Sequence, residues 1–185
     1  CFKRITNMAL AKEWMRKDPF YGYKMAQDET DPVFLTYPEL KSIMEKEFTI
    51  PRLALVRDIF VFAAFTGLAF ADVSTLTKDN LVQDNNGDWW IRKGRVKLER
   101  RHRASSICNI PLLPVPLAIL KKYEEHPICR KKSLCLPVIC NQRMNSYLKE
   151  IADLCNIRKN LTTHMRSHSD FSFLLKFKHL QIFAA

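Results

Sequence analysis

A long apolar stretch closed by a glycine constrains the fold of this chain most strongly. Pro51 suits the first turn of a helix, because the N–H group that proline lacks has no intrahelical partner there. Apolar residues then fall on every side of the segment, which predicts a central core helix from Pro51 to Phe65. Gly67 predicts a left-handed cap at its end. After this cap the chain is expected to turn tightly into a short second helix.

The first part of the chain has a separate helical pattern. Apolar residues recur at helical spacing over residues 1–17, and Asp18-Pro19 stops the pattern because the residue before a proline disfavours the α region. This helix starts without a methionine or an N-cap, so we expect that an upstream domain is missing. Residues 19–35 read as an extended linker. A second unit begins at residue 36 with a helix to about Glu47, for which Thr36 is a suitable N-cap.

The periodicity changes between residues 79 and 111. Asp84-Asn85-Asn86-Gly87 is a strong turn signal between Leu81-Val82 and Trp89-Trp90-Ile91, and Ile107 to Leu112 has the composition of a third strand. Two further helices are expected over residues 117–123 and 144–155. The predicted class is therefore α+β, mainly α with a small antiparallel β-sheet inserted between helices.

The charge balance points to a polyanionic partner. Thirty Lys and Arg residues against nineteen Asp and Glu residues give a formal net charge of +11. Such a surface favours double-stranded DNA, with a nonspecific basic surface as the alternative and an anionic membrane as a weaker one. No apolar run reaches the length of a membrane span and no signal peptide opens the chain, so we expect a cytoplasmic protein.

The cysteines do not indicate a disulfide framework or a metal site. They form no Cys-x-x-Cys pair, and we expect reduced thiols, no zinc and no cofactor. They are Cys1, Cys108, Cys129, Cys135, Cys140 and Cys155.

A basic segment separates the second and third predicted strands. Residues 92–103 hold seven Lys or Arg residues and one acid, Glu99. A charge run of this kind is ordinarily a solvated loop, but a basic loop between strands can also follow DNA phosphates, and we favour DNA contact. The candidate DNA-binding residues here are Lys93, Arg95, Arg100, Arg101 and Arg103.

A series of motifs in this order resembles the catalytic domain of tyrosine recombinases, the phage-integrase family. The series comprises Phe65-Thr66-Gly67-Leu68, Trp89-Trp90-Ile91, the basic segment, Asn109-Ile110-Pro111-Leu112 and Leu161-Thr162-Thr163-His164. The resemblance covers residues 36–166 and is to recombinases of the kind found in conjugative and mobilisable elements. Residues 1–18 resemble the last helix of the core-binding domain, which would place Arg4 and Lys12 near the DNA backbone.

The resemblance implies phosphodiester transfer, in which a tyrosine attacks the scissile phosphate and basic groups stabilise the charge that develops on it. Lys97 matches the hairpin lysine that protonates the leaving oxygen, with Lys93 as the second choice. His164 and Arg166 match phosphate-binding residues at the start of a late helix. Asp72 matches the acidic position, although it could equally be a solvated or capping aspartate.

The sequence departs from the family pattern at three places. Ala69 stands where the family has its first arginine, and Arg166 lies one place too early for the His-x-x-Arg spacing, because one residue turns a helix by about 100 degrees. No tyrosine follows Tyr147. The tail 167–185 matches nothing in the family, so we expect a catalytic domain that is incomplete at its C-terminus, through truncation or a shifted reading frame.

Three functions remain open from the sequence. The first is a recombinase fragment in DNA integration or excision that lacks the nucleophile. The second is a noncatalytic DNA-binding module that occupies recombination sites. The third, an unrelated small helical nucleic-acid-binding protein, fits the ordered motifs least. Double-stranded DNA is the expected partner, other recombinase protomers are possible partners, and neither a small-molecule substrate nor a membrane is expected.

Overall fold

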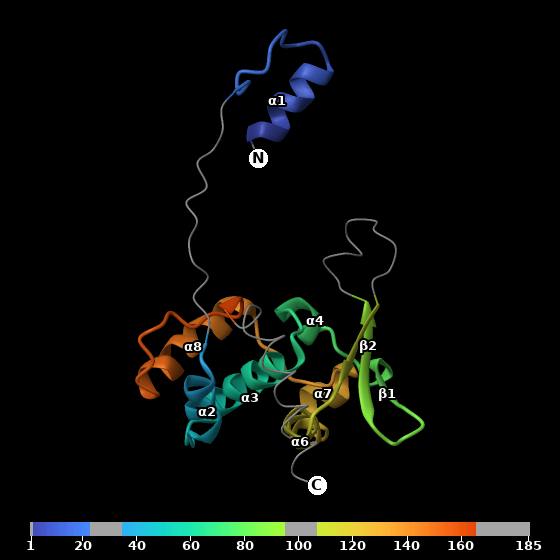
Figure 1. Cartoon of the computed structure of the whole chain (residues 1–185), viewed down its shortest axis with the longest axis vertical. Helices are drawn as coiled ribbons and strands as arrows, with labels where there is room; N and C mark the ends of the chain where they lie inside the picture. Colours follow the sequence, from blue (N-terminus) through green and yellow to red (C-terminus); the bar gives the residue numbers. More distant parts are fainter. Residues whose placement is uncertain (1, 23–34, 95–106, 166–185) are drawn as a thin grey trace. The chain divides into compact units, whose positions relative to one another are not determined.

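The computed structural model describes residues 2–22, 35–94 and 107–165 (Figure 1). The chain divides into two compact units, residues 1–31 and 32–185, each with its own internal contacts. The predicted Arg95, Lys97, Arg100, Arg101, Arg103 and Arg166 lie outside the described residues, as does the tail 167–185.

In its described residues, 2–22, the first unit contains one short helix, α1, Phe2–Ala11. The aromatic rings of Phe2 and Phe20 meet edge to face, with their centroids 5.9 Å apart, so the chain folds back after the helix. The prediction of a helix through residue 17 is wrong. Glu13 has φ 57°, a left-handed conformation that a right-handed helix cannot continue.

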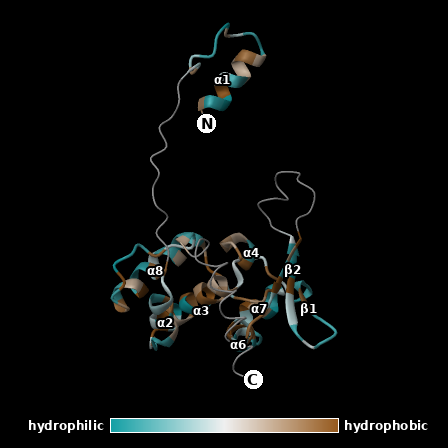
Figure 2. Cartoon of the chain, viewed as in Figure 1, coloured by the Kyte–Doolittle hydropathy of each residue, from teal (hydrophilic) through white to brown (hydrophobic). Residues whose placement is uncertain are grey.

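Helix α3, Pro51–Thr66, forms the centre of the second unit (Figure 2). Its side chains are buried on nearly every side, including Ile59, Phe60 and Phe62 at 1% exposure or less, as the sequence predicts for a core helix. Gly67 ends the helix with φ 64° and donates its N–H to the Ala63 carbonyl, which confirms the predicted left-handed cap.

Three helices pack against α3 (Figure 1). They are α2, Tyr37–Glu45, α6, Pro114–Tyr123, and α8, Asn141–Leu154. Each presents buried aliphatic residues to α3, among them Ile43, Ile119 and Leu148. Thr36 begins α2, and its N–H and hydroxyl both donate to Glu39 Oε2, at 2.7 Å and 2.8 Å.

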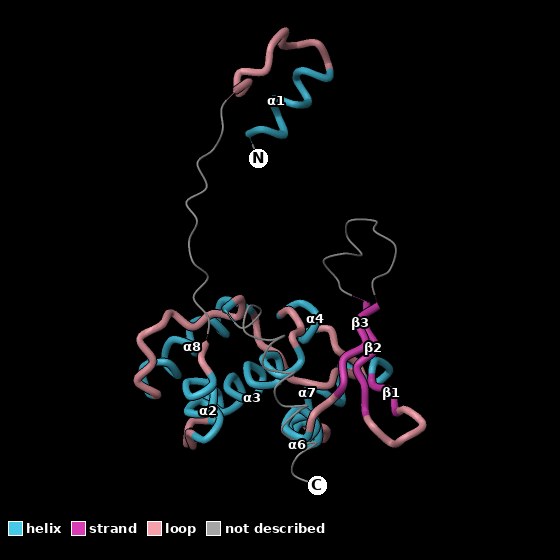
Figure 3. The backbone as a smooth tube through the Cα atoms, viewed as in Figure 1, coloured by secondary structure: helices cyan, strands magenta, loops and turns pink. Residues whose placement is uncertain are grey.

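The sheet has three antiparallel strands in the order β1-β2-β3 (Figure 3). These are β1, Leu81–Gln83, β2, Trp89–Gly94, and β3, Ile107–Pro111. Ile91 at the centre pairs with Leu81 and Ile110 and is fully buried, so one face of the sheet joins the core. Asp84 closes the β1–β2 turn by accepting hydrogen bonds from the backbone N–H groups of Asn86 and Asp88. The predicted α+β class is confirmed.

The structure corrects two helix boundaries and adds one helix. Helix α6 begins at Pro114 and α8 at Asn141, three residues earlier than predicted in both cases, because proline and polar residues are compatible with a first helical turn. Helix α7, Pro127–Lys132, was not predicted. Its six residues are too few to show a helical period, and only Cys129 among them is buried.

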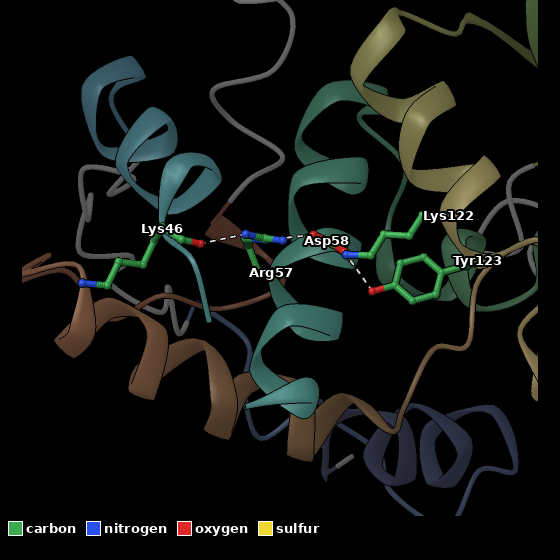
Figure 4. A network of polar contacts seen from close by, with 5 residues as sticks. All are labelled: Lys46, Arg57, Asp58, Lys122 and Tyr123. Carbon is green, nitrogen blue, oxygen red and sulfur yellow. Dashed lines mark hydrogen bonds and ion pairs between the residues drawn. The ribbon is translucent and has the colours of Figure 1, made fainter. Parts of the chain in front are cut away.

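A buried carboxylate ties α3 to its neighbours (Figure 4). Asp58 Oδ1 accepts from Arg57 Nε at 2.8 Å, while Asp58 Oδ2 accepts from Lys122 Nζ at 2.7 Å and from the Tyr123 hydroxyl at 2.8 Å. Arg57 also donates to the Lys46 carbonyl at the end of α2. Burial, together with the neighbouring Asp58, raises the pKa of Tyr123 above its usual value, so this phenol remains a donor. One aspartate thereby joins α2, α3 and α6.

Removal of this carboxylate should destabilise the second unit strongly. We expect Asp58→Ala to lower the free energy of unfolding by about 3 kcal/mol, because two cations lose their counter-charge and one of them, Arg57, is largely buried. Tyr123→Phe removes a single hydrogen bond and should cost about 1 kcal/mol. Urea unfolding followed by circular dichroism measures both changes.

The matched control is Glu124→Gln, which removes an exposed ion pair with Lys78 and should leave the unfolding midpoint unchanged. An Asp58→Ala variant as stable as the parent chain would show that the helices do not depend on this network.

Candidate nucleic-acid interface

The end of strand β2 places one predicted lysine beside helix α4, Phe70–Ser74. Lys93 Nζ donates to the Thr75 carbonyl at 2.8 Å and lies 3.5 Å from Asn80 Oδ1. Thr75 caps the C-terminus of α4, and Asn80 ends the short 3-10 helix η1, Lys78–Asn80. An ammonium has three donors, so a donor remains for a further acceptor such as a phosphate oxygen. The β2–β3 hairpin therefore carries a lysine whose ammonium is held against a rigid element.

Helix α4 carries the predicted acidic residue. Asp72 is 3% exposed, which excludes the solvated aspartate that the sequence left open. Its role beside a phosphate-binding group remains a prediction. Ala69, where the resembling family has an arginine, is the exposed N-cap residue of α4 and offers no cation there.

The segment after α8 carries His164 and is attached at both ends. Lys159 Nζ donates to Glu39 Oε2 at 2.7 Å, which fastens the start of the segment to the N-terminus of α2. Leu161 is fully buried, and Met165 packs against the core. Between these anchors His164 is exposed to solvent, as a residue that contacts an external ligand must be.

Two asparagines of α8 hold the residue before His164. The Thr163 N–H donates to Asn145 Oδ1 at 2.9 Å, and the Thr163 hydroxyl donates to Asn141 Oδ1 at 2.8 Å. Neither asparagine was predicted from the sequence as a functional residue. The available signal was their spacing of four residues, which puts both on one face of a helix.

The predicted basic residues of the first unit are exposed. Arg4 lies on α1, and Lys12 follows the helix with its ammonium 5.0 Å from the centre of the Trp14 ring. Neither side chain is buried, so both are accessible to a polyanion. Their part in DNA binding remains a prediction.

The tyrosines and thiols of the core do not resemble activated nucleophiles. Tyr123 is buried and donates to Asp58, and Tyr147, on α8, is partly buried with the Arg52 guanidinium 5.4 Å from its ring centre. Burial raises the pKa of the Cys135 thiol to about 12, so it stays protonated at neutral pH. Cys129 is likewise a buried free thiol with a raised pKa, again because of burial.

Solved structures with a similar fold include recombinases. The XerH recombinase in a post-cleavage complex with a palindromic difH substrate superposes with a TM-score of 0.61 at 19% sequence identity, covering 85% of this chain and 46% of that chain. The pre-cleavage complex of XerH with difH gives 0.58 at 20% identity, covering 88% and 48%. XerA recombinase gives 0.54 at 14% identity, covering 93% and 66%. The chain has a tyrosine recombinase fold.

The chain spans about half the length of the XerH chains that it matches. No protein-family model and no curated protein sequence matches it. Separately, none of the described helices combines the length and apolar character needed to cross a membrane.

The Lys159–Glu39 ion pair should make stability depend on pH. Burial by itself would raise the pKa of Glu39, but hydrogen bonds from Lys159 and Thr36 outweigh it and leave the pKa below the usual 4.5. A lowered carboxyl pKa contributes stability above the unfolded-state pKa, and this contribution is lost as the pH falls through the folded-state pKa. Glu39→Gln should therefore cost about 1 kcal/mol at neutral pH, and this cost should shrink as the pH falls through the folded-state pKa.

Urea unfolding of both proteins across this pH range measures the difference. Glu45→Gln, in the exposed pair Lys41–Glu45 of the same helix, is the matched control and should show no such pH dependence. A Glu39→Gln penalty of equal size at both pH extremes would contradict the ionic role.

Proposed function

We propose that this chain binds duplex DNA through the β2–β3 hairpin and the His164 turn, as a site-specific recombinase or integrase module without its own nucleophile. The observation that carries the proposal is the fold, which it shares with XerH recombinases in complexes with their DNA substrate. The basic segment 92–103 joins β2 to β3, and Lys93 at its start is held beside α4. An origin in a mobile element and contact with other recombinase protomers belong to the same proposal.

The chemistry available to these residues is charge stabilisation at a phosphate. Lys93 and His164 can donate to phosphate oxygens, while Ala69 replaces the arginine that would complete the group. All five tyrosines precede His164, whereas the resembling family places its nucleophile after the histidine. Among them, Tyr123 is buried and Tyr147 is a partly buried residue of α8. We therefore propose binding without strand cleavage by this polypeptide. A noncatalytic module that occupies recombination sites is the form of this function that fits these residues best.

A suicide-substrate assay tests the absence of cleavage. A nicked duplex releases a short strand after cleavage, so an attacking tyrosine would stay covalently attached to the labelled DNA. With a pool of nicked duplexes we expect no adduct on a denaturing gel, although the same duplexes bind the native protein. A labelled band that migrates with the protein in detergent would contradict the proposal.

Binding should weaken steeply with salt, because cations that neutralise phosphates release condensed counterions. For six phosphate contacts the slope of log Kobs against log salt concentration is about −5. We expect Lys93→Gln to make this slope shallower by about 0.9, the contribution of one contact. Fluorescence anisotropy of a labelled duplex at several salt concentrations measures the slope.

Lys121→Gln is the matched control, because Lys121 is an exposed lysine of α6 and its removal changes the net charge equally. Equal slopes for the two variants would show that only the overall charge of the chain matters. Salt-independent binding by the parent chain would contradict the proposed mode altogether.

A further inference from the structure

The turn that carries His164 is held by a pair of hydrogen bonds that use both donors of one residue. Thr163 donates its N–H to Asn145 and its hydroxyl to Asn141, and the threonine is 3% exposed. Asn141 and Asn145 lie four residues apart on α8, so their side chains project from the same face. Two bonds to one rigid helix fix the orientation of Thr163 as well as its position.

Other side chains of α8 fix this helix in the core. Met144, Leu148 and Ile151 are fully buried in the core that surrounds α3. The asparagines therefore hold the Thr163 turn, which has little regular structure of its own, in a fixed position relative to a packed helix. Reorientation of Thr163 would leave its buried donors without acceptors, which is energetically costly.

His164 immediately follows this clamped residue and is itself exposed. Its backbone direction is set by the peptide plane shared with Thr163, because that plane is rigid. On the other side, the N–H of Met165 donates to the Thr162 carbonyl at 3.2 Å, which closes a tight turn around the histidine. The backbone that carries the imidazole is thus held on both sides of His164.

We infer that Asn141 and Asn145 are positioning residues that aim His164 at a DNA phosphate, an inference that rests on the proposed function. Precise placement matters because a hydrogen bond to a phosphate weakens steeply when its donor is misaligned. The asparagines act through the Thr163 turn and do not themselves contact DNA. They differ from ordinary packing residues in one respect: their effect on DNA binding passes through the imidazole.

A double-mutant cycle separates this role from a purely structural one. The variants are Thr163→Val, which removes the hydroxyl donor while keeping the branched shape, His164→Ala, and the double variant. We expect Thr163→Val to weaken binding of a fluorescein-labelled duplex about fivefold when His164 is present and less than about twofold when it is absent. Thr163→Ser, which keeps the donor, should bind as the parent chain does.

Tyr123→Phe is the matched control for the cycle. It also removes one buried hydroxyl hydrogen bond, but from the α3–α6 network. Its effect on DNA binding should be the same with and without His164. Equal effects of Thr163→Val in both backgrounds would overturn the inference, even though the chain binds DNA.

A second measurement needs no DNA. In the chain labelled with 13C-histidine, His164→Ala identifies the imidazole signal of His164 in the NMR spectrum. Thr163→Val should shift this signal and Thr163→Ser should leave it in place. An unshifted signal in Thr163→Val would overturn the positioning role by itself. A shifted signal in a chain that fails to bind duplex would instead refute the proposed function and, with it, the aim at phosphate.

Discussion

The Asp58 carboxylate is the interaction on which the rest of the second unit depends. It accepts hydrogen bonds from Arg57, Lys122 and Tyr123, and Arg57 also donates to the carbonyl of Lys46, the C-cap residue of α2. A buried charge is tolerated only when it is paired and hydrogen-bonded, so these partners and the aspartate require one another. The apolar surfaces of α2, α3 and α6 would allow many packings, whereas this network is satisfied in one arrangement of the three helices.

The position of the sheet depends on the same helices. It lies in the chain between α3 and α6, so both ends of the segment that contains it are fixed by the Asp58 network. Ile91 anchors one face in the core, and Lys93 ties the end of β2 to the end of α4. The His164 turn is fixed independently, through α8, which packs on α3. The two candidate phosphate contacts, Lys93 and His164, are far apart in sequence. Both are thus positioned through contacts that lead back to α3.

Sequence patterns predicted those features that depend on neighbours along the chain. The apolar run, Pro51 and Gly67 indicated α3 and its cap, and Asp84 to Gly87 indicated the hairpin turn, because each signal acts within a few residues. Short or weakly amphipathic elements were missed or misjudged. Helix α7 is too short to show a period, and α1 ends six residues before the predicted limit because Glu13 takes a left-handed conformation.

By itself, the sequence determined the helical core, the small sheet, the excess of basic residues and the order of motifs, since all of these are local or compositional. Only the tertiary structure decided that Asp72 is buried, that Lys93 meets the end of α4, and that Asn141 and Asn145 clamp the turn before His164. These contacts join residues brought together by packing. A hydrogen bond depends on distances and angles in space, and no spacing along a single chain specifies those between separate elements.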